Sequence, residues 1–81
     1  MYICKKMPDR ELLLKFGRRI RRLRTARGLT QEQLAELTGF HRTYIGMIER
    51  GERNISLGNI GVFAETFEIT VSALLDFGGD N

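Results

Sequence analysis

One glycine, Gly39, stands between two short helical patterns in the segment TQEQLAELTGFHRTYIGMIERG, which begins at Thr30. Thr30 and Gln33 have the spacing of a capping box, which starts a helix, and Phe40 and Ile45 have the spacing of a hydrophobic staple at the start of the next one. Glycine adopts a positive φ without steric cost, so a turn of about three or four residues is sufficient here. The two helices are therefore expected to cross as a pair and to pack against the helix that precedes them.

Six positions of this segment agree with the pattern of a helix-turn-helix motif. Counting from Gln31, the small residue Ala35 is fifth, where it lets the two helices approach closely, and Gly39 is ninth. The fourth, tenth, fifteenth and eighteenth positions are apolar and can hold the pair against the preceding helix; they are Leu34, Phe40, Ile45 and Ile48. A glycine between two helices occurs in many bundles, whereas agreement at six positions favours a DNA-binding motif.

The remainder of the chain also has helical patterning, with no strand alternation and with Pro8 as its single proline. Capping residues and apolar stripes predict an all-α, compact bundle of five helices, at about residues 10–27, 31–38, 42–50, 57–67 and 71–77. Residues 9–79 are expected to form one domain for DNA binding and dimerisation. Residues 1–8 match no part of the pattern and are predicted to be an N-terminal arm that can be disordered.

Charge is distributed unevenly along the chain, although the net charge is only +3. Residues 1–28 carry ten Lys and Arg against two acids, residues 29–53 carry three Arg against four Glu, and residues 54–81 carry four acids and no Lys or Arg. One end of the molecule should therefore attract polyanions and the other should repel them. A charged helix face that is merely solvated gives the same pattern, so charge alone does not assign the function.

Several functional classes lack the residues that they need. Cys4 is the single cysteine, which excludes an intrachain disulfide and a Cys/His metal site and fits a reducing cytoplasm. The apolar runs are too short to span a membrane. His41 is the single histidine and has no nucleophile or paired carboxylate beside it, so we interpret it as a helix cap or surface group. The chain is predicted not to be an enzyme and to need no cofactor, metal or small-molecule ligand.

The stretch from Phe16 to Leu75 resembles the five-helix DNA-binding domain of the lambdoid phage repressor and Cro family. Within that family, the run HRTYIGMIERGERNIS is most similar to the controller proteins of bacterial restriction–modification systems. The resemblance implies a homodimeric, sequence-specific transcriptional regulator that binds the major groove of double-stranded DNA at a pseudo-palindromic operator. It implies a bacterial, cytoplasmic, nucleoid-associated protein that regulates its own gene and an endonuclease gene, with RNA polymerase as a further candidate partner.

The resemblance assigns base reading to the start of the second helix of the motif, which lies in the major groove. Arg42 is expected to donate two hydrogen bonds to guanine, and Thr43 to contact a base or a phosphate. Met47, one turn further on, is expected to make apolar contact with bases, and Tyr44 either to reach a phosphate or to pack. Without the motif, Arg42 would be interpreted as a solvated residue and Met47 as a packing residue.

Three further residues are expected to bind the DNA backbone. Gln31, at the start of the first helix of the motif, matches the phosphate-binding glutamine of the family, and the helix N-terminus adds partial positive charge there. Arg53 and Asn54 lie in the segment that follows the recognition helix, which in the family runs along the sugar–phosphate backbone.

Two structural roles complete the prediction. Arg24 and Glu49 match positions that form an internal ion pair in the family, and we interpret them as holding the recognition helix to the first helix. A short last helix cannot turn every apolar residue of the C-terminal segment inward, which predicts a two-fold dimer interface there; the candidate interface residues are Phe67, Ile69, Val71, Leu75 and Phe77. Glu68 stands where relatives commonly have glycine and is expected to need a left-handed conformation.

Two alternatives remain open at this point. One is a phage-type repressor or an antitoxin with the same fold and other target sites. The other is a protein-interaction module of the same fold that does not bind DNA. DNA-compatible side chains at Gln31, Arg42, Thr43 and Met47 argue against the second alternative, because an interaction module has no need of them.

Overall fold

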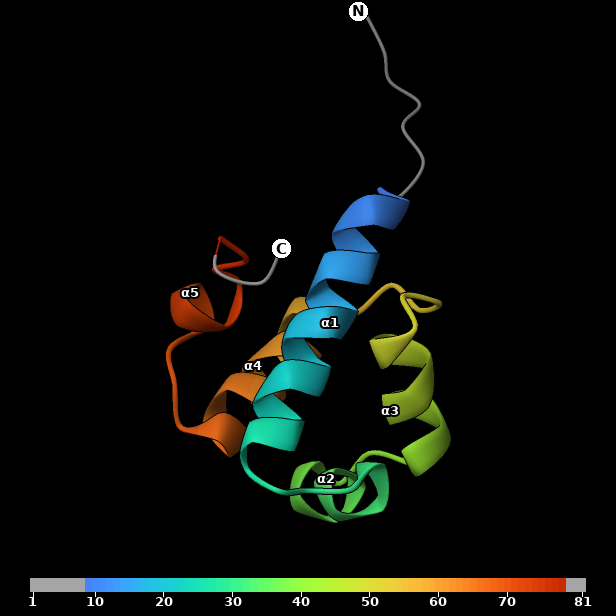
Figure 1. Cartoon of the computed structure of the whole chain (residues 1–81), viewed down its shortest axis with the longest axis vertical. Coiled ribbons are helices and arrows are strands. Elements are labelled where there is room, and N and C mark those ends of the chain that lie inside the picture. The colour runs from blue at the N-terminus through green and yellow to red at the C-terminus, as the bar shows by residue number, and fades with distance from the viewer. Residues whose placement is uncertain (1–8, 79–81) are drawn as a thin grey trace, which may run out of the picture.

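The computed structural model describes residues 9–78, and over that range it contains helices only: α1 (Arg10–Ala26), α2 (Gln31–Thr38), α3 (Arg42–Glu49), α4 (Leu57–Phe67) and α5 (Val71–Leu74). In Figure 1, α1 runs through the middle of the molecule, α3 and α5 lie to either side, and α2 crosses below its C-terminal end. The predicted five-helix all-α fold is confirmed for these residues. The predicted arm at residues 1–8, Cys4 within it, and residue 79 lie outside the described residues.

A side chain caps the N-terminus of every helix in the described residues. Thr30 and Gln33 form both hydrogen bonds of the predicted capping box, with Gln33 N donating to Thr30 Oγ1 at 3.0 Å and Thr30 N donating to Gln33 Oε1 at 2.9 Å. The remaining caps are Asp9, His41, Ser56 and Thr70. Local polar residues thus satisfy backbone donors that a helix leaves unpaired at its start.

The turn between α2 and α3 depends on Gly39, which has φ = 83° and ends α2 in the left-handed conformation. Glu68 ends α4 in the same region, with φ = 60° and ψ = 41°, and is the one residue other than glycine with a positive φ in the described chain. The predicted left-handed conformation of Glu68 is confirmed. Its cost is offset because Glu68 N donates to Glu65 O and Ile69 N donates to Ala64 O, each at 3.0 Å.

Helix α5 is shorter than the sequence predicted, because it ends at Leu74 and not at residue 77. In a longer helix the carbonyl groups of Ala73 and Leu74 would accept from the next turn. Both also accept from Arg19 of α1, whose Nη2 lies 2.9 Å from Ala73 O and whose Nε lies 3.3 Å from Leu74 O, while Asp76 N donates to Ala73 O at 3.2 Å. The Arg19 guanidinium therefore attaches the C-terminal end of α5 to α1.

The core is built from one apolar face of each helix. Its fully buried large side chains are Ile20, Leu34, Ile45, Ile48, Phe63, Phe67 and Leu74. The burial of Phe67 corrects the predicted dimer interface, since a side chain enclosed by its own chain offers no surface to a partner. Phe67 contributes to the stability of the monomer fold instead.

Gly17 is a point of close contact between α1 and α3, which the sequence did not reveal. A β-carbon built at Gly17 would lie 2.6 Å from the carbonyl oxygen of Glu49, and closer still to that of Ile48. Both obstructing atoms belong to the backbone at the end of α3, so no side-chain rotation can relieve the contact. The absence of a side chain at Gly17 thus fixes the depth at which α3 packs on α1.

None of the helices in the described part of the chain has the length and apolar character required to cross a membrane.

Candidate nucleic-acid interface

The N-terminus of α3 presents exposed polar side chains at a rigid helix start. The imidazole Nδ1 of His41 accepts from Thr43 N at 3.0 Å and so caps the helix. Arg42 and Thr43 follow directly and are both exposed. Because His41 orders the first turn, the backbone beneath these two side chains is fixed even though the side chains themselves reach into solvent.

A shallow polar depression joins this helix start to α2. It is lined by Gln31 from α2, by Arg42, Thr43 and Gly46 from α3, and by Arg50, the C-cap residue of α3. Four of these residues offer polar side chains, and Gly46 is buried beneath those of Arg50 and Gln31. The structure therefore brings together Gln31, Arg42 and Thr43, three of the residues predicted to bind DNA, while Met47 lies next to them and is half-buried.

Arg42 is paired with Glu32 across the two helices of the motif. Arg42 Nη1 donates to Glu32 Oε2 at 2.7 Å, and the two side chains are 64% and 66% exposed. Exposed ion pairs of this kind contribute about 0.2–1 kcal/mol to stability. The pair places Arg42 Nη1 against α2 in this structure and contributes little to folding.

Arg50 belongs to the same face and was missed by the sequence analysis. Its Nε lies 3.1 Å from Glu52 Oε2, and its Nη1 lies 3.1 Å from the position that a β-carbon at Gly46 would occupy. Arg42, Gly46 and Arg50 are spaced four residues apart, which places them along one helix face. That spacing was the available signal, and it identifies Arg50 as a second arginine on this face, where its side chain covers Gly46.

Tyr44 both packs and supports a cation. Its hydroxyl accepts from Asn59 Nδ2 of α4 at 2.9 Å, and its ring contacts Phe40 edge-on, with the centroids 5.0 Å apart. The guanidinium of Arg53 lies over the ring, with Cζ 5.3 Å from the centroid. Such cation–π contacts are attractive and directional, so Tyr44 orients Arg53 next to α3.

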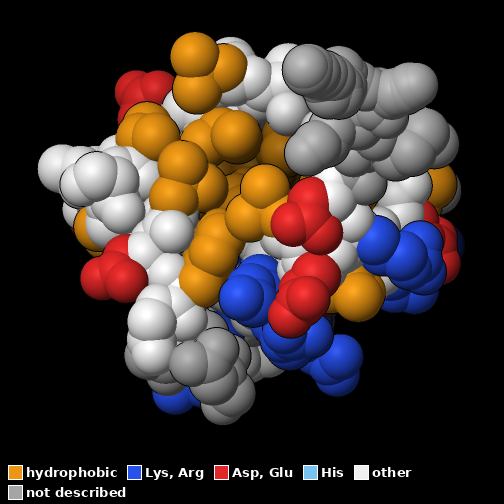
Figure 2. Space-filling model, turned by 90° about the horizontal axis from the view of Figure 1, so that it is seen from above, with side chains coloured by type: hydrophobic (Ala, Val, Ile, Leu, Met, Phe, Trp, Pro, Cys, Tyr) orange, Lys and Arg blue, Asp and Glu red, His pale blue; other side chains and the backbone are white. Residues whose placement is uncertain are grey.

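Asn54 does not line the polar depression. It lines an apolar groove of about 380 Å³ together with Leu12, Leu13, Phe16, Ile55, Ile60, Leu75 and Phe77. Figure 2 shows hydrophobic side chains gathered around a hollow on the end of the molecule that is seen from above. Leu12 and Leu75 are 50% and 38% exposed, which leaves a substantial apolar surface at this end. Of the predicted dimer residues, Leu75 and Phe77 line the groove.

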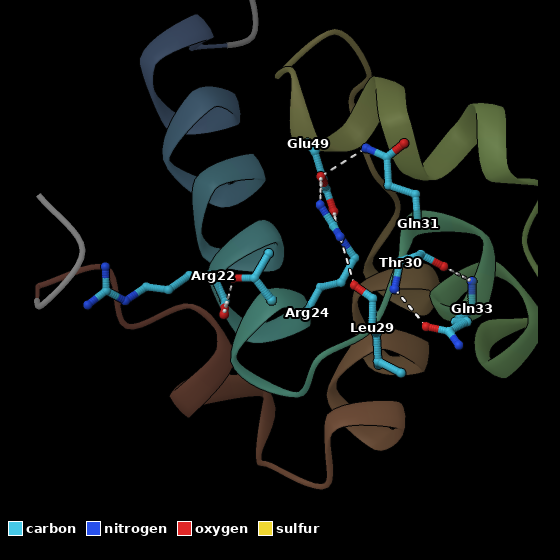
Figure 3. A network of polar contacts seen from close by, with 8 residues as sticks. Arg22, Arg24, Leu29, Thr30, Gln31, Gln33 and Glu49 are labelled. Carbon is cyan, nitrogen blue, oxygen red and sulfur yellow. Dashed lines mark hydrogen bonds and ion pairs between the residues drawn. The ribbon is translucent and has the colours of Figure 1, made fainter.

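A buried polar network connects the interface to α1 (Figure 3). Arg24 donates to both carboxylate oxygens of Glu49, at 2.6 Å from Nε and 3.0 Å from Nη2, and Arg24 Nη1 donates to Leu29 O at 2.8 Å. Gln31 Nε2 donates to the same carboxylate at 3.0 Å. The Arg24 and Glu49 side chains are only 11% and 3% exposed. Four polar groups from α1, α2, α3 and the connecting loop are thus satisfied by one another inside the protein.

Gln31 consequently has a second role that the sequence did not predict. One amide hydrogen is given to Glu49, and the amide nitrogen carries a second one. The contact with Glu49 fixes the side chain at the edge of the polar depression. Gln31 is therefore a preoriented donor and not a freely rotating surface group.

Comparison with known families and proteins gives consistent results. The family model described as helix-turn-helix matches residues 20–74. The chain is 39% identical to the control protein C.SmaI of Serratia marcescens over 74 residues, covering 85% of this chain and 88% of that protein. It is 43% identical to the control protein C.BamHI of Bacillus amyloliquefaciens over 65 residues, covering 79% and 80% of the two chains.

Solved structures of similar proteins have the same fold. The restriction–modification controller protein C.AhdI of Aeromonas hydrophila is 53% identical, with a TM-score of 0.73 over 76% of this chain and 94% of that one. The restriction–modification controller protein C.Esp1396I, solved as a tetramer in complex with its natural 35 base-pair operator, is 32% identical. Its TM-score is 0.73, over 80% of this chain and 86% of that one.

Proposed function

This chain belongs to the helix-turn-helix family, and we propose that it is a sequence-specific DNA-binding transcriptional regulator that controls a restriction–modification system. The observation that carries the proposal is the exposed face of α3, where Arg42 and Thr43 stand on a capped helix start beside Gln31. The protein acts in the bacterial cytoplasm on nucleoid DNA, with RNA polymerase at the promoter as a further partner. This role is one of binding and requires no catalytic group.

The polar face of α3 has the chemistry to read base edges in a major groove. The Arg42 guanidinium can donate in parallel to O6 and N7 of guanine, and the Thr43 hydroxyl can donate or accept. Gly46 is buried beneath Arg50 and Gln31, and its lack of a side chain leaves room for both on this face. Met47, half-buried behind this face, contributes apolar contact.

The flanks of α3 have donors for the phosphates on either side. Gln31 offers its second amide hydrogen at the N-terminus of α2, where the helix dipole favours an anion. Arg53, held over the Tyr44 ring, supplies a positive charge at the other end. The Tyr44 hydroxyl accepts from Asn59, so its own hydrogen is available to a phosphate. Arg50 adds a second cation to this set. We also propose that Asn54 contacts the sugar–phosphate backbone of DNA from the exposed rim of the apolar groove.

We expect the protein to bind a pseudo-palindromic operator as a homodimer formed through the apolar groove. The occupant of the groove is a second copy of the chain, since Leu12 and Leu75 leave apolar surface uncovered at this end. Phe77 also lines the groove, and we propose Ile69 and Val71 as further contacts of the dimer. In Figure 1 this end, with α5, lies opposite α2, so a two-fold dimer leaves both α3 helices accessible to DNA. Half-sites one helical turn apart, about 34 Å, would match it.

Arg42→Ala tests the reading role. We expect it to weaken binding to the operator by about 1–3 kcal/mol per half-site and to flatten the preference at one base pair, because a bidentate contact to guanine is lost. Binding to random duplex should change much less. The measurement is a titration against a duplex that the wild-type protein selects from a randomised library, against single-base variants of it, and against random duplex.

Arg53→Ala is the matched control for that experiment. It removes the same charge from a residue assigned to a phosphate, so it should weaken binding to selected and random duplexes alike and reduce the salt dependence. If Arg42→Ala also weakens all duplexes equally, Arg42 is a phosphate contact and the assignment of the reading residue is wrong.

Leu75→Asp tests the dimer interface. A carboxylate placed in the apolar groove would be desolvated on dimerisation, so the dissociation constant of the dimer should rise by on the order of 30-fold or more. Sedimentation velocity over a range of protein concentrations measures the change. Leu37→Asp is the control, because Leu37 is an exposed leucine on α2, away from the groove. A Leu75→Asp protein that remains as dimeric as the Leu37→Asp protein would place the interface elsewhere.

A further inference from the structure

Glu32 is an acidic residue on a surface that the proposed function brings against DNA. It lies in the first turn of α2, next to Gln31, and its carboxylate contacts Arg42 at the start of α3. The two residues are ten positions apart in sequence and meet only because the Gly39 turn sets α2 against α3. A carboxylate at such a site repels phosphate, so its presence needs an explanation beyond stability.

The geometry of the contact leaves part of the arginine available. Glu32 accepts from Nη1 of Arg42 at 2.7 Å, and within residues 9–78 the structure gives Nε and Nη2 no hydrogen-bond partner. A guanidinium is planar and carries five donors, and its Nε–Nη2 edge forms one of the parallel pairs that match guanine O6 and N7. Glu32 can therefore keep Nη1 while the adjacent edge binds a base.

We propose that Glu32 is a specificity-determining residue of the DNA interface, which positions Arg42 for guanine and disfavours its use as a phosphate clamp. The inference rests on the proposed function and names a determinant within it. Binding to random DNA depends on neutralising phosphates, so a fixed negative charge beside Arg42 weakens it. The negative charge of Glu32 weakens binding to the operator less, because guanine presents acceptor atoms without a full charge. The contact between Arg42 and guanine is also strengthened when the arginine is already oriented.

Glu32→Gln tests the inference, because it removes the charge and keeps the shape of the side chain. We expect affinity for random duplex to rise and its salt dependence to become steeper, since Arg42 is released to neutralise a phosphate. The ratio of affinities for selected and random duplexes should fall by about two- to fivefold, the range that corresponds to an exposed ion pair. The preference for guanine at the base pair read by Arg42 should flatten. The duplexes are the one that the wild-type protein selects from a randomised library and a random duplex of equal length.

Two controls separate positioning from a simple change of charge. Glu36→Gln removes an exposed carboxylate one turn further along α2, and it should leave the ratio of affinities unchanged. In an Arg42→Ala background, Glu32→Gln should likewise leave the ratio unchanged, because the residue that it positions is absent. Thermal unfolding of each variant establishes that it is folded.

Each result supports or overturns the inference. A fall in the ratio for Glu32→Gln that disappears without Arg42 supports it. Equal gains in both affinities for Glu32→Gln and Glu36→Gln would overturn it, because Glu32 would then be only a negative charge. A wild-type protein that selects a sequence, with a Glu32→Gln variant of unchanged ratio, overturns the inference alone. A wild-type protein that enriches no sequence overturns the proposed function together with the inference.

Discussion

Replacing Gly17 by alanine is expected to destabilise the protein by about 3 kcal/mol, at the upper end of the usual cost of overpacking. Replacing a glycine in the middle of a helix by alanine usually has the opposite effect and stabilises the helix by about 1 kcal/mol. At Gly17 the added methyl group would overlap the carbonyl oxygens of Ile48 and Glu49. The backbone of α3 must then move away from α1, which loosens the apolar layer around Ile48.

Gly61→Ala is the matched control for this prediction. Gly61 also lies inside a helix, α4, and a β-carbon built there has no neighbouring atom within 4 Å among the described residues. The Gly61→Ala substitution should stabilise the protein by about 0.5–1 kcal/mol. Urea unfolding of all three proteins at one protein concentration measures both changes, because dimerisation makes stability depend on concentration. If Gly17→Ala is as stabilising as Gly61→Ala, the helices are not in close contact at this point.

The helix starts could be predicted from the sequence because the interactions that form them are local. The capping box of Thr30 and Gln33 uses residues three positions apart, and Ser56 and Thr70 act within their own first turns. The turn at Gly39 depends on one residue type with an unusual φ. Patterns of this kind can be read directly, because their partners stand next to each other in the chain.

The features that were missed depend on residues far apart in the chain. The last carbonyl groups of α5 accept hydrogen bonds from Arg19, which lies more than fifty residues earlier in the chain. Phe67 is buried because the core closes over it, and hydrophobicity alone does not distinguish a core residue from an interface residue. Gly17 is needed because α3 happens to pack there. Local sequence carries no signal for any of these contacts.

The candidate site was predicted more completely than these packing details, although not from physics alone. Spacing around Gly39 located the motif, whereas the separate roles of Gln31 and Arg42 came from the family resemblance. What the resemblance did not supply is the support behind each residue. Glu49 orients Gln31, Glu32 holds Arg42, and Tyr44 carries Arg53. These partners lie on neighbouring helices, so they become visible only once the helices are packed.

Glu49→Ala is expected to cost about 3–5 kcal/mol, the loss that follows when one member of a buried ion pair is removed. The Glu49 carboxylate accepts two hydrogen bonds from Arg24 and one from Gln31, and its side chain is 3% exposed. Alanine would leave the Arg24 charge buried and unpaired, and it would release the Gln31 amide. Urea unfolding at fixed protein concentration measures the loss, and affinity for DNA should fall as well because α3 and Gln31 lose their common anchor.

Two further variants show whether pairing is the cause. Glu52→Ala breaks the exposed pair with Arg50, which should cost less than about 1 kcal/mol. The double variant Arg24→Met/Glu49→Met replaces the buried pair with apolar groups of similar size, and it should recover most of the loss, because no buried charge is left without a partner. Raising the salt concentration should weaken the Arg50–Glu52 contribution and leave that of Arg24–Glu49 nearly unchanged, since buried pairs are poorly screened. If the effects of Arg24→Met and Glu49→Met are simply additive in a double-mutant cycle, the two side chains are not coupled and the network does not hold α3 to α1.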